Sequence, residues 1–186
     1  ASIVGPTAFL DVEILTPWLN DITASANGAV TFRVLPAASA AAPADVFDAV
    51  EAGLVDIGWS VMSYTAGRFP AASVVDLPLM ADDAEEASIA LWHLYDRGLL
   101  DGLDGVKVLG IFTSDILRLH HVGAVDGLAG FRGARVRAAG QDISATLETL
   151  GAVPVGLPIT SVAESLARHV IEGAAQVLVH LNDGRV

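Results

Sequence analysis

Short runs of β-branched and apolar residues alternate with amphipathic segments along the chain, and this alternation limits the fold more than any other feature. Apolar residues that recur at three- and four-residue steps predict helices, whereas compact β-branched runs bounded by Gly or Pro predict strands. The expected helices are 11–26, 43–52, 82–100, 143–150 and 160–171. The expected strands are 30–36, 54–59, 106–112, 116–122, 135–139, 153–157 and 175–181.

Alternating helices and strands favour an α/β architecture in which helices cover parallel sheets. A break in the pattern near residues 110–130 separates two such sets. We therefore predict a first α/β lobe at residues 1–112 and a second at residues 113–186. The length of 186 residues fits this division, since a domain takes roughly 100–200 residues and smaller lobes are common.

Composition excludes several classes of protein. Hydrophobic residues make up 53% of the chain and charged residues 17%, which indicates a folded core. No stretch approaches the ~18 consecutive apolar residues of a spanning helix, so direct membrane insertion is not expected. The formal net charge of −12 repels nucleic acids and anionic lipid surfaces, so neither is an expected partner.

Little in the sequence indicates catalysis. The absence of cysteine removes disulfides, thiolate metal sites and cysteine nucleophiles, and no cofactor is expected. His120 and His121 would point to opposite faces of a strand, which argues against a shared metal ion. Ser114 and Asp115 lie close to them and supply the residue types of a hydrolase, but no Gly-x-Ser-x-Gly elbow is present. We predict that the protein is not an enzyme and keep a hydrolase as the weaker alternative.

The positive charges are almost all arginine: nine arginines accompany the single Lys107. Arginine keeps its proton and offers two parallel N–H donors, which suit a carboxylate better than the ammonium of lysine does. The placement of the arginines is therefore the most informative feature for a binding function.

Several phrases in order carry a family resemblance: 18–36, 49–58, 69–70, 77–79, 127–137 and 150–158. The most specific is 127–137, which reads GLAGFRGARVR and is similar to a leucine-lysine-glycine-x-lysine-x-arginine signature. On these residues the chain resembles the solute-binding subunits of tripartite ATP-independent periplasmic (TRAP) transporters of the dicarboxylate-binding, DctP type. The resemblance covers nearly the whole chain.

The resemblance implies a two-lobed, periplasmic-binding-protein-like fold of type II, incomplete here at both ends. The family's first strand would precede Ala1, and its return to the first lobe would follow Val186. It also implies a periplasmic protein whose signal peptide has been removed, with a small organic carboxylate and TRAP membrane permease subunits as partners. Departures at Ser161, Ala163 and His169, where the family often has Glu, Tyr and Gly, leave the identity of the acid open.

Four residues are the candidates for ligand binding. The resemblance makes Arg137 the carboxylate clamp and Arg118 a second arginine on the ligand side. For Arg137 the alternative is a surface or interlobe salt bridge. Trp59 follows a predicted strand and is either an aromatic wall of the site or a core residue. Gln176 is either a polar ligand contact or a solvated amide at a strand end.

Two further tryptophans, Trp18 and Trp92, fall on apolar helix faces, and we expect them in the core.

The predicted function is capture of a small organic carboxylate by an arginine clamp and closure of two lobes, for secondary uptake through a TRAP transporter. The main alternative is a ligand-sensing effector domain of a transcription regulator, which also uses two α/β lobes. That class needs a DNA-binding helical module, and these residues contain none.

Overall fold

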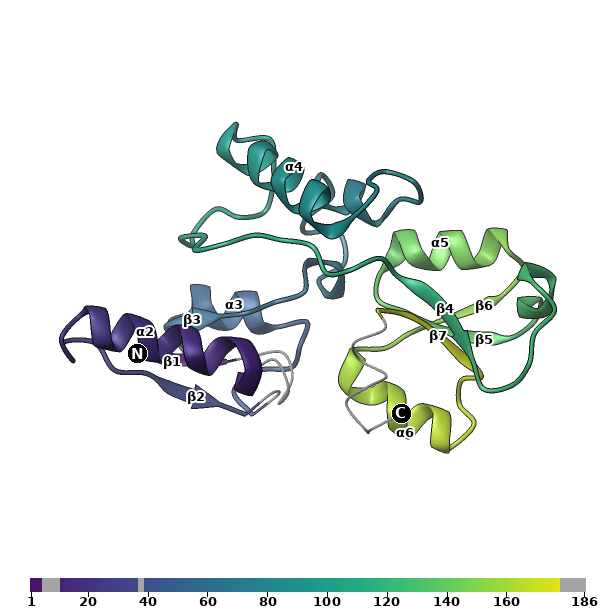
Figure 1. Cartoon of the computed structure of the whole chain (residues 1–186), viewed down its shortest axis with the longest axis horizontal. Coiled ribbons are helices and arrows are strands. Elements are labelled where there is room, and N and C mark those ends of the chain that lie inside the picture. The colour runs from purple at the N-terminus through teal and green to yellow at the C-terminus, as the bar shows by residue number, and fades with distance from the viewer. Residues whose placement is uncertain (5–10, 37–38, 178–186) are drawn as a thin grey trace. The chain divides into compact units, whose positions relative to one another are not determined.

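The computed structural model of the chain describes residues 1–4, 11–36 and 39–177 (Figure 1). It divides into two compact units, Ala1–Thr65 and Ala66–Val186. Each unit has its own sheet and its own buried clusters. The compact units divide at a different residue from the lobe boundary at residue 112, which stays a prediction.

The sheet of the first unit has three parallel strands in the order β2-β1-β3. The strands are β1 (Ser2–Val4), β2 (Arg33–Leu35) and β3 (Ile57–Gly58). The expectation that the first strand precedes Ala1 is wrong for this sheet, because Ser2–Val4 forms its central strand. No strand was predicted there, since three residues are too few to establish a periodicity.

Helices pack against this sheet. They are the π-helix η1 (Asp11–Leu15), α2 (Thr16–Ser25) and α3 (Val46–Glu51). The 3-10 helix η2 (Met62–Tyr64) follows β3 in the chain. Leu15 and Leu19 are buried with Ile3 of β1 in one core cluster. The predicted end of the helix at Asn27 and Gly28 is confirmed: both have positive φ, and their N–H groups bond the carbonyls of Ala24 and Thr23 in a Schellman motif.

The second unit begins with η3 (Ala72–Asp76) and α4 (Ala84–Asp96). α4 starts where the acidic residues predicted it, because the side chain of Asp83 accepts a 2.8 Å hydrogen bond from the N–H of Glu86. The strand predicted at 106–112 does not form. A strand needs a hydrogen-bonding neighbour, and no other segment of the described chain pairs with these residues.

The sheet of the second unit has four strands in the order β4-β7-β5-β6. The strands are β4 (Arg118–His121), β5 (Arg135–Ala138), β6 (Val153–Gly156) and β7 (Gly173–Gln176). β5, β6 and β7 are parallel, as the alternation predicted, but β4 pairs with β7 in the antiparallel direction. The connection from β4 to β5, the next strand in the chain, contains no α-helix, unlike the connections from β5 to β6 and from β6 to β7.

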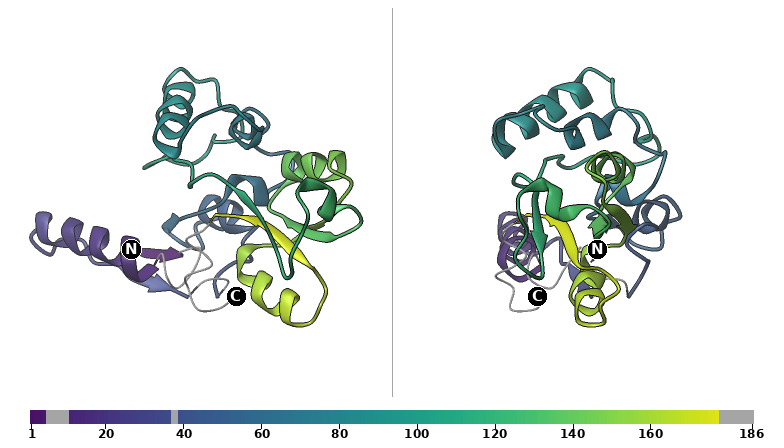
Figure 2. Two further views of the ribbon diagram at one scale, coloured as in Figure 1. Left: turned by 45° about the vertical axis from the view of Figure 1, so that its right-hand side comes forward. Right: turned by 90° about the vertical axis from the view of Figure 1, so that its right-hand side faces the viewer.

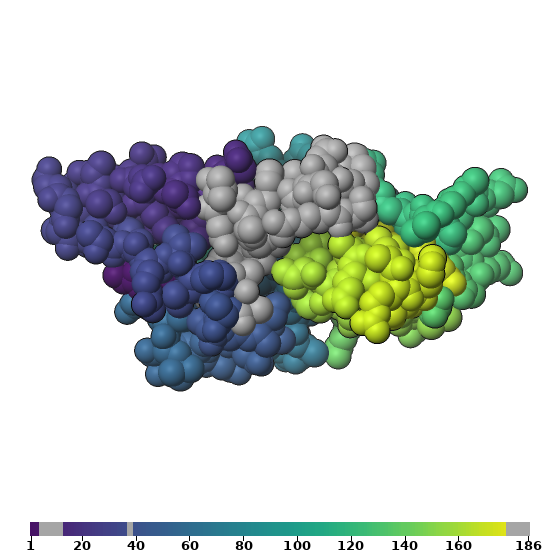
Figure 3. Space-filling model, turned by 90° about the horizontal axis from the view of Figure 1, so that it is seen from below, coloured from purple at the N-terminus to yellow at the C-terminus, as the bar shows by residue number. Residues whose placement is uncertain are grey.

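Two helices cover opposite faces of this sheet, as the ribbon views show (Figure 1, Figure 2). α5 (Gln141–Thr149) packs on one face through a cluster around Val136 and Leu147. α6 (Val162–Ala167) packs on the other face around Val162 and Ala174, and its outer side forms the yellow surface in Figure 3. The 3-10 turns η4 (Leu128–Phe131) and η5 (Ile159–Ser161) complete the unit.

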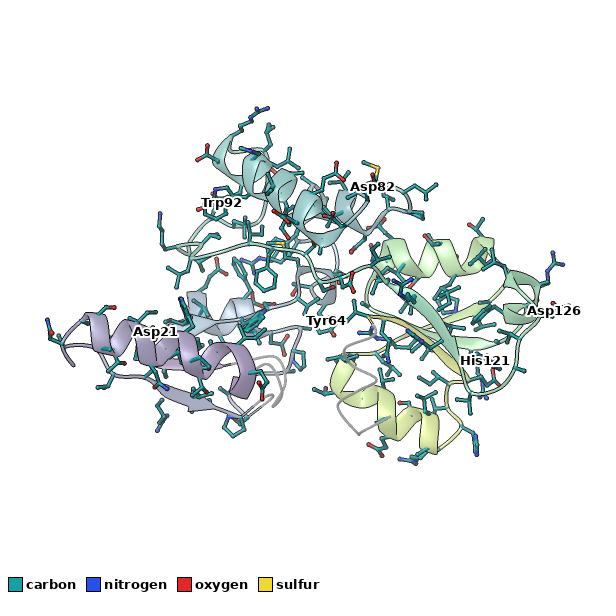
Figure 4. All side chains as sticks on the ribbon, in the orientation of Figure 1. Asp21, Tyr64, Asp82, Trp92, His121 and Asp126 are labelled. Carbon is teal, nitrogen blue, oxygen red and sulfur yellow. The ribbon has the colours of Figure 1, made fainter. Side chains whose placement is uncertain are left out.

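The expected core positions of two tryptophans are wrong. Trp18 of α2 is 43% exposed, and Trp92 of α4, labelled in Figure 4, is 41% exposed. Trp92 packs instead on Tyr95 of the same helix, with 5.3 Å between the ring centroids. An apolar stripe predicts which face of a helix is apolar, but whether another element covers that face depends on the tertiary fold.

Candidate functional site

Three of the four predicted site residues belong to the sheet of the second unit and lie toward one edge of it. Parallel strands end at a common edge, and in α/β sheets ligands bind beyond the carboxyl ends of the strands. Gln176 is the last residue of β7, and Arg137 is the third residue of β5. Arg118 is the first residue of β4, which runs the opposite way and therefore starts at the same edge.

The register also puts these three residues on one face of the sheet. Arg118 is the Cα partner of Gln176 across the β4–β7 pair. Arg137 is the Cα partner of Ala174, which lies two residues before Gln176 in β7. Because side chains alternate along a strand, Arg118, Gln176 and Arg137 share the face that α6 covers.

Arg137 is buried at its strand end, with 3% of its surface exposed. Its Nε donates a 2.8 Å hydrogen bond to the carbonyl of Leu157, and its Nη1 donates a 3.0 Å bond to the carbonyl of Ala175. These carbonyls carry no net charge, so they orient the guanidinium without neutralising it. The role of Arg137 as a carboxylate clamp stays a prediction.

Gln176 is 1% exposed, which rules out the alternative of a solvated strand-end amide. Its Oε1 and Nε2 are both buried and find no hydrogen-bond partner among residues 1–4, 11–36 and 39–177. A buried polar group left without a partner costs about 1–3 kcal/mol. Such an amide indicates that something else completes its hydrogen bonding.

Arg118 differs from Arg137 in being exposed. Its side chain leaves the backbone opposite that of Gln176, because the two residues are Cα partners across the strand pair. Residues directly opposite in an antiparallel pair have Cβ atoms about 4.5–5.5 Å apart. Two side chains whose Cβ atoms are this close can both extend to the same small anion.

Trp59 belongs to the first unit, directly after β3. It is half-buried and packs against the cluster of Ile3, Leu15 and Leu19, so the core interpretation accounts for part of its surface. The next residue, Ser60, has a buried hydroxyl oxygen with no partner in the described part of the chain. Sequence reasoning missed Ser60, although its place after a strand of a parallel sheet was a usable signal.

The paired histidines of β4 point to opposite faces, as predicted. His121, labelled in Figure 4, contacts the ring of Phe131 edge-on at a centroid distance of 5.8 Å. His120 lies on the face of Arg118 and Gln176, and its Nε2 is 3.2 Å from the carbonyl oxygen of Gln176. Sequence reasoning considered His120 only for metal binding and catalysis, although its spacing of two residues from Arg118 already put both on one face.

A second arginine of β5 is tied to a carboxylate at the opposite edge of the sheet. Arg135 Nη2 lies 3.0 Å from Glu172 Oε1, and the N–H of Arg135 donates to Glu172 Oε2 at 2.8 Å. These hydrogen bonds hold the pKa of Glu172 below its ordinary value. Arg135 therefore forms an ion pair with Glu172 at the edge away from Arg118 and Gln176.

One carboxyl group near the same unit's N-terminal turn is perturbed in the other direction. Burial, and to a lesser extent the negative charge of Asp142, raises the pKa of Asp76 to about 6. Asp142 lies in the first turn of α5, and Asp76 ends η3. The two carboxyl groups belong to elements that contact each other. They are not part of the group formed by Arg118, Arg137 and Gln176.

The sequence of the whole chain fits one protein family. Residues 3–186 match the family described as DctP, bacterial extracellular solute-binding protein, family 7. The chain belongs to this family. The resemblance inferred from the 127–137 signature is thereby confirmed, and so is the α/β fold class.

Solved solute-binding proteins of TRAP transporters have the same fold as this family 7 protein. One from Rhodoferax ferrireducens T118, with copurified benzoate, is 28% identical and superposes with a TM-score of 0.89 over 97% of this chain and 59% of its own. One from a marine metagenome, with metahydroxyphenylacetate, is 32% identical, with a TM-score of 0.89 over 94% of this chain and 57% of its own.

A curated relative of this solute-binding protein is the outer membrane transporter protein TsaT of Comamonas testosteroni, 28% identical over 160 residues. That match covers 84% of this chain and 47% of the relative, so the chain spans about half the length of the relative. Among the described helices, none combines the length and apolar character needed to cross a bilayer.

Proposed function

We propose that this protein is an extracytoplasmic receptor that captures a small aromatic carboxylate for uptake by a TRAP transporter. Arg137 and Arg118 bind the carboxylate, Gln176 binds a neighbouring polar group of the ligand, and Trp59 supplies an aromatic wall. Membership of the solute-binding family supports the receptor role. Closure of the lobes around the acid is the part of the proposal that comes from the resemblance alone.

The observation that carries this proposal is the buried amide of Gln176. Its Nε2 donates and its Oε1 accepts, and neither has a partner in the described part of the chain. It shares a sheet face with the buried guanidinium of Arg137 and lies opposite Arg118. A carboxylic acid with a nearby hydroxyl matches this set, because the carboxylate accepts from N–H groups and the hydroxyl donates to Oε1.

The choice of an aromatic acid comes from the solved relatives. The marine metagenome protein, 32% identical, has also been solved with 3-hydroxybenzoate. A protein from Bordetella bronchiseptica with bound mandelate is 30% identical, with a TM-score of 0.83 over 97% of this chain and 60% of its own. Benzoate, hydroxybenzoate and mandelate share one carboxylate on or beside an aromatic ring, and two of the three carry a hydroxyl.

Two arginines supply a large part of the binding energy for such a ligand. A hydrogen bond to a charged group contributes about 1.5–3 kcal/mol. Micromolar affinity corresponds to about −8 kcal/mol, so the arginines need help from the amide and from apolar contact with the ring. Exclusion of water on closure strengthens each ion pair, because the local dielectric constant falls.

We place the receptor in the periplasm, where it delivers the acid to TRAP membrane permease subunits. The family is extracellular by description, which supports export from the cytoplasm. The closed, liganded form is the one that a permease would recognise, because only a ligand with different affinities for the two forms can shift their populations.

The arginine clamp is tested by titration calorimetry with benzoate, 3-hydroxybenzoate and mandelate. Arg118→Gln should weaken binding by about ten- to a hundredfold, the loss of one charge-assisted bond. Arg137→Lys keeps the charge but loses the two-pronged donor, and we expect a similar loss. Arg137→Lys should also lower the thermal midpoint, because the carbonyls of Leu157 and Ala175 each lose a donor.

Arg135→Gln is the matched control, since Arg135 lies on the same strand but is tied to Glu172 at the other edge. Its affinity for the acids should stay within about twofold of the wild type, the range expected for a residue outside the site. Wild-type affinity for the acids in Arg118→Gln and Arg137→Lys, as in the control Arg135→Gln, would contradict the clamp. Failure of the wild type to bind any of the acids would contradict the aromatic carboxylate itself.

A further inference from the structure

We infer that His120 is a positioning residue of the ligand site, holding the end of β7 so that the Gln176 amide faces the ligand. The inference rests on the proposed function, because it concerns the same site. His120 itself has no assigned contact with the acid, and it acts through the main chain of Gln176.

Two consecutive carbonyl oxygens of β7 receive side-chain hydrogen bonds from the two strands that flank it. Arg137 of β5 donates from Nη1 to the carbonyl of Ala175 at 3.0 Å. His120 of β4 lies with Nε2 at 3.2 Å from the carbonyl of Gln176. The last two residues of β7 are therefore held from both sides, and one of the two holding groups is the proposed carboxylate clamp.

The chemistry of this contact determines which nitrogen of the His120 ring carries a hydrogen atom. A carbonyl oxygen only accepts hydrogen bonds, so Nε2 of His120 must carry the hydrogen. Neutral imidazole with hydrogen on Nε2 and protonated imidazole both satisfy this requirement. The contact therefore depends on the presence of an N–H donor at this point, and not on the charge of the ring.

The register explains why both side chains can reach β7. Ala174 is the Cα partner of His120 on one side and of Arg137 on the other. One face of the sheet thus carries the row His120, Ala174, Arg137 across three neighbouring strands. The methyl group of Ala174 is the smallest side chain that an L-residue offers, and it leaves room for the two longer side chains to extend along β7.

Gln176 needs such support because it ends its strand. Strand and helix ends open more easily than their middles, and a glutamine side chain has several rotatable bonds. Its buried amide has no described partner that fixes it. Holding the carbonyl of Gln176 sets the direction in which its side chain leaves the backbone, so the amide is preorganised before the acid binds.

Calorimetry with 3-hydroxybenzoate tests this role. His120→Ala should weaken binding about tenfold through faster dissociation, since a buried acceptor loses its donor and the amide loses its orientation. His120→Phe keeps a ring without an N–H and should show the same loss. His120→Gln restores an N–H donor at the end of a chain of similar reach, and we expect its affinity within about threefold of the wild type.

His121→Gln is the matched control: it has the same residue type on the same strand, but its ring faces Phe131 on the opposite side of the sheet. Its affinity should equal that of the wild type. A common loss in both His120→Gln and His121→Gln would mean that β4 is merely destabilised, which overturns the positioning role. Far-UV circular dichroism of each variant shows whether it is folded.

The same measurements distinguish failure of the positioning role from failure of the proposed function. If the wild type binds 3-hydroxybenzoate and Arg118→Gln weakens it, while His120→Ala and His120→Phe bind as the wild type does, the positioning role is wrong and the proposed function stands. If the wild type binds none of benzoate, 3-hydroxybenzoate and mandelate, the proposed function falls, and the role of His120 falls with it.

Discussion

A single backbone conformation at His169 shows what one residue contributes to this fold. His169 has φ of 53°, the left-handed region that favours glycine. It follows α6, where its N–H bonds the carbonyl of Leu166 and the N–H of Val170 bonds that of Ser165, a Schellman motif. A residue with a Cβ is strained in this conformation, so glycine would fit this turn better than histidine does.

His169→Gly should therefore stabilise the protein, by about 1 kcal/mol, because glycine adopts this conformation without the clash of a Cβ. Urea denaturation followed by circular dichroism measures the change. Arg168→Gly is the control: its φ of −91° is ordinary, so glycine there should only destabilise. A midpoint for His169→Gly below that of the wild type would refute the assignment of strain.

At the same scale, the sequence predicted residue types better than residue environments. The family resemblance points to Arg137 and Arg118, and both lie toward one edge of one sheet face. The burial of Gln176 was not predictable, because it depends on strands that are distant in sequence. His120 was missed for the same reason: its partner, the carbonyl of Gln176, lies 56 residues away.

At the scale of elements, the carboxyl group of Asp76 in η3 interacts electrostatically with that of Asp142 in α5. The pKa of Asp76 is raised to about 6 from its ordinary 3.8, mainly by burial and then by Asp142. Between these values the folded state binds more protons than the unfolded state. Stability contributed by this group is therefore present at low pH and is lost as the pH rises from 3.8 to about 6.

Asp76→Asn should remove this loss and stabilise the protein above pH 6, by about 1–2 kcal/mol after allowance for solvent screening of a partly exposed group. Chemical denaturation at about pH 7.5 and at about pH 3.5 measures the difference in the free energy of unfolding between Asp76→Asn and the wild type. The gain should vanish at the lower pH. Asp142→Asn, which removes only the lesser cause, should give a smaller gain; an equal gain at both pH values would contradict the burial of a charged Asp76.

The elements predicted well are those with local signals at their ends. Asn27 and Gly28 end α2, as the sequence indicated, and Asp83 caps the start of α4 one residue after the predicted Asp82. The failures involve strands, whose existence depends on a partner. The run 106–112 has strand composition but no described neighbour, and Ser2–Val4 is a strand because two others flank it.

For the whole molecule, each unit having its own sheet and cores means that the two can unfold at different denaturant concentrations. We expect two transitions in urea. Trp18 and Trp59 report on the first unit and Trp92 on the second, so Trp92→Phe and the double variant Trp18→Phe with Trp59→Phe isolate the two signals. Coincident midpoints for these two variants would show a single cooperative transition.

The strand orders of the two sheets also dictate when each can be assembled during synthesis. The central strand of the first sheet, β1, leaves the ribosome before its neighbours, so β2 and β3 can each pair with it as soon as they are synthesised. In the second sheet the strand between β4 and β5 is β7, which is made last of the four. Until residues 173–176 are synthesised, β4 and β5 have no strand that pairs with both of them. Arg118 and Arg137, the proposed ligands of the carboxylate, therefore remain on strands that are not yet joined in one sheet.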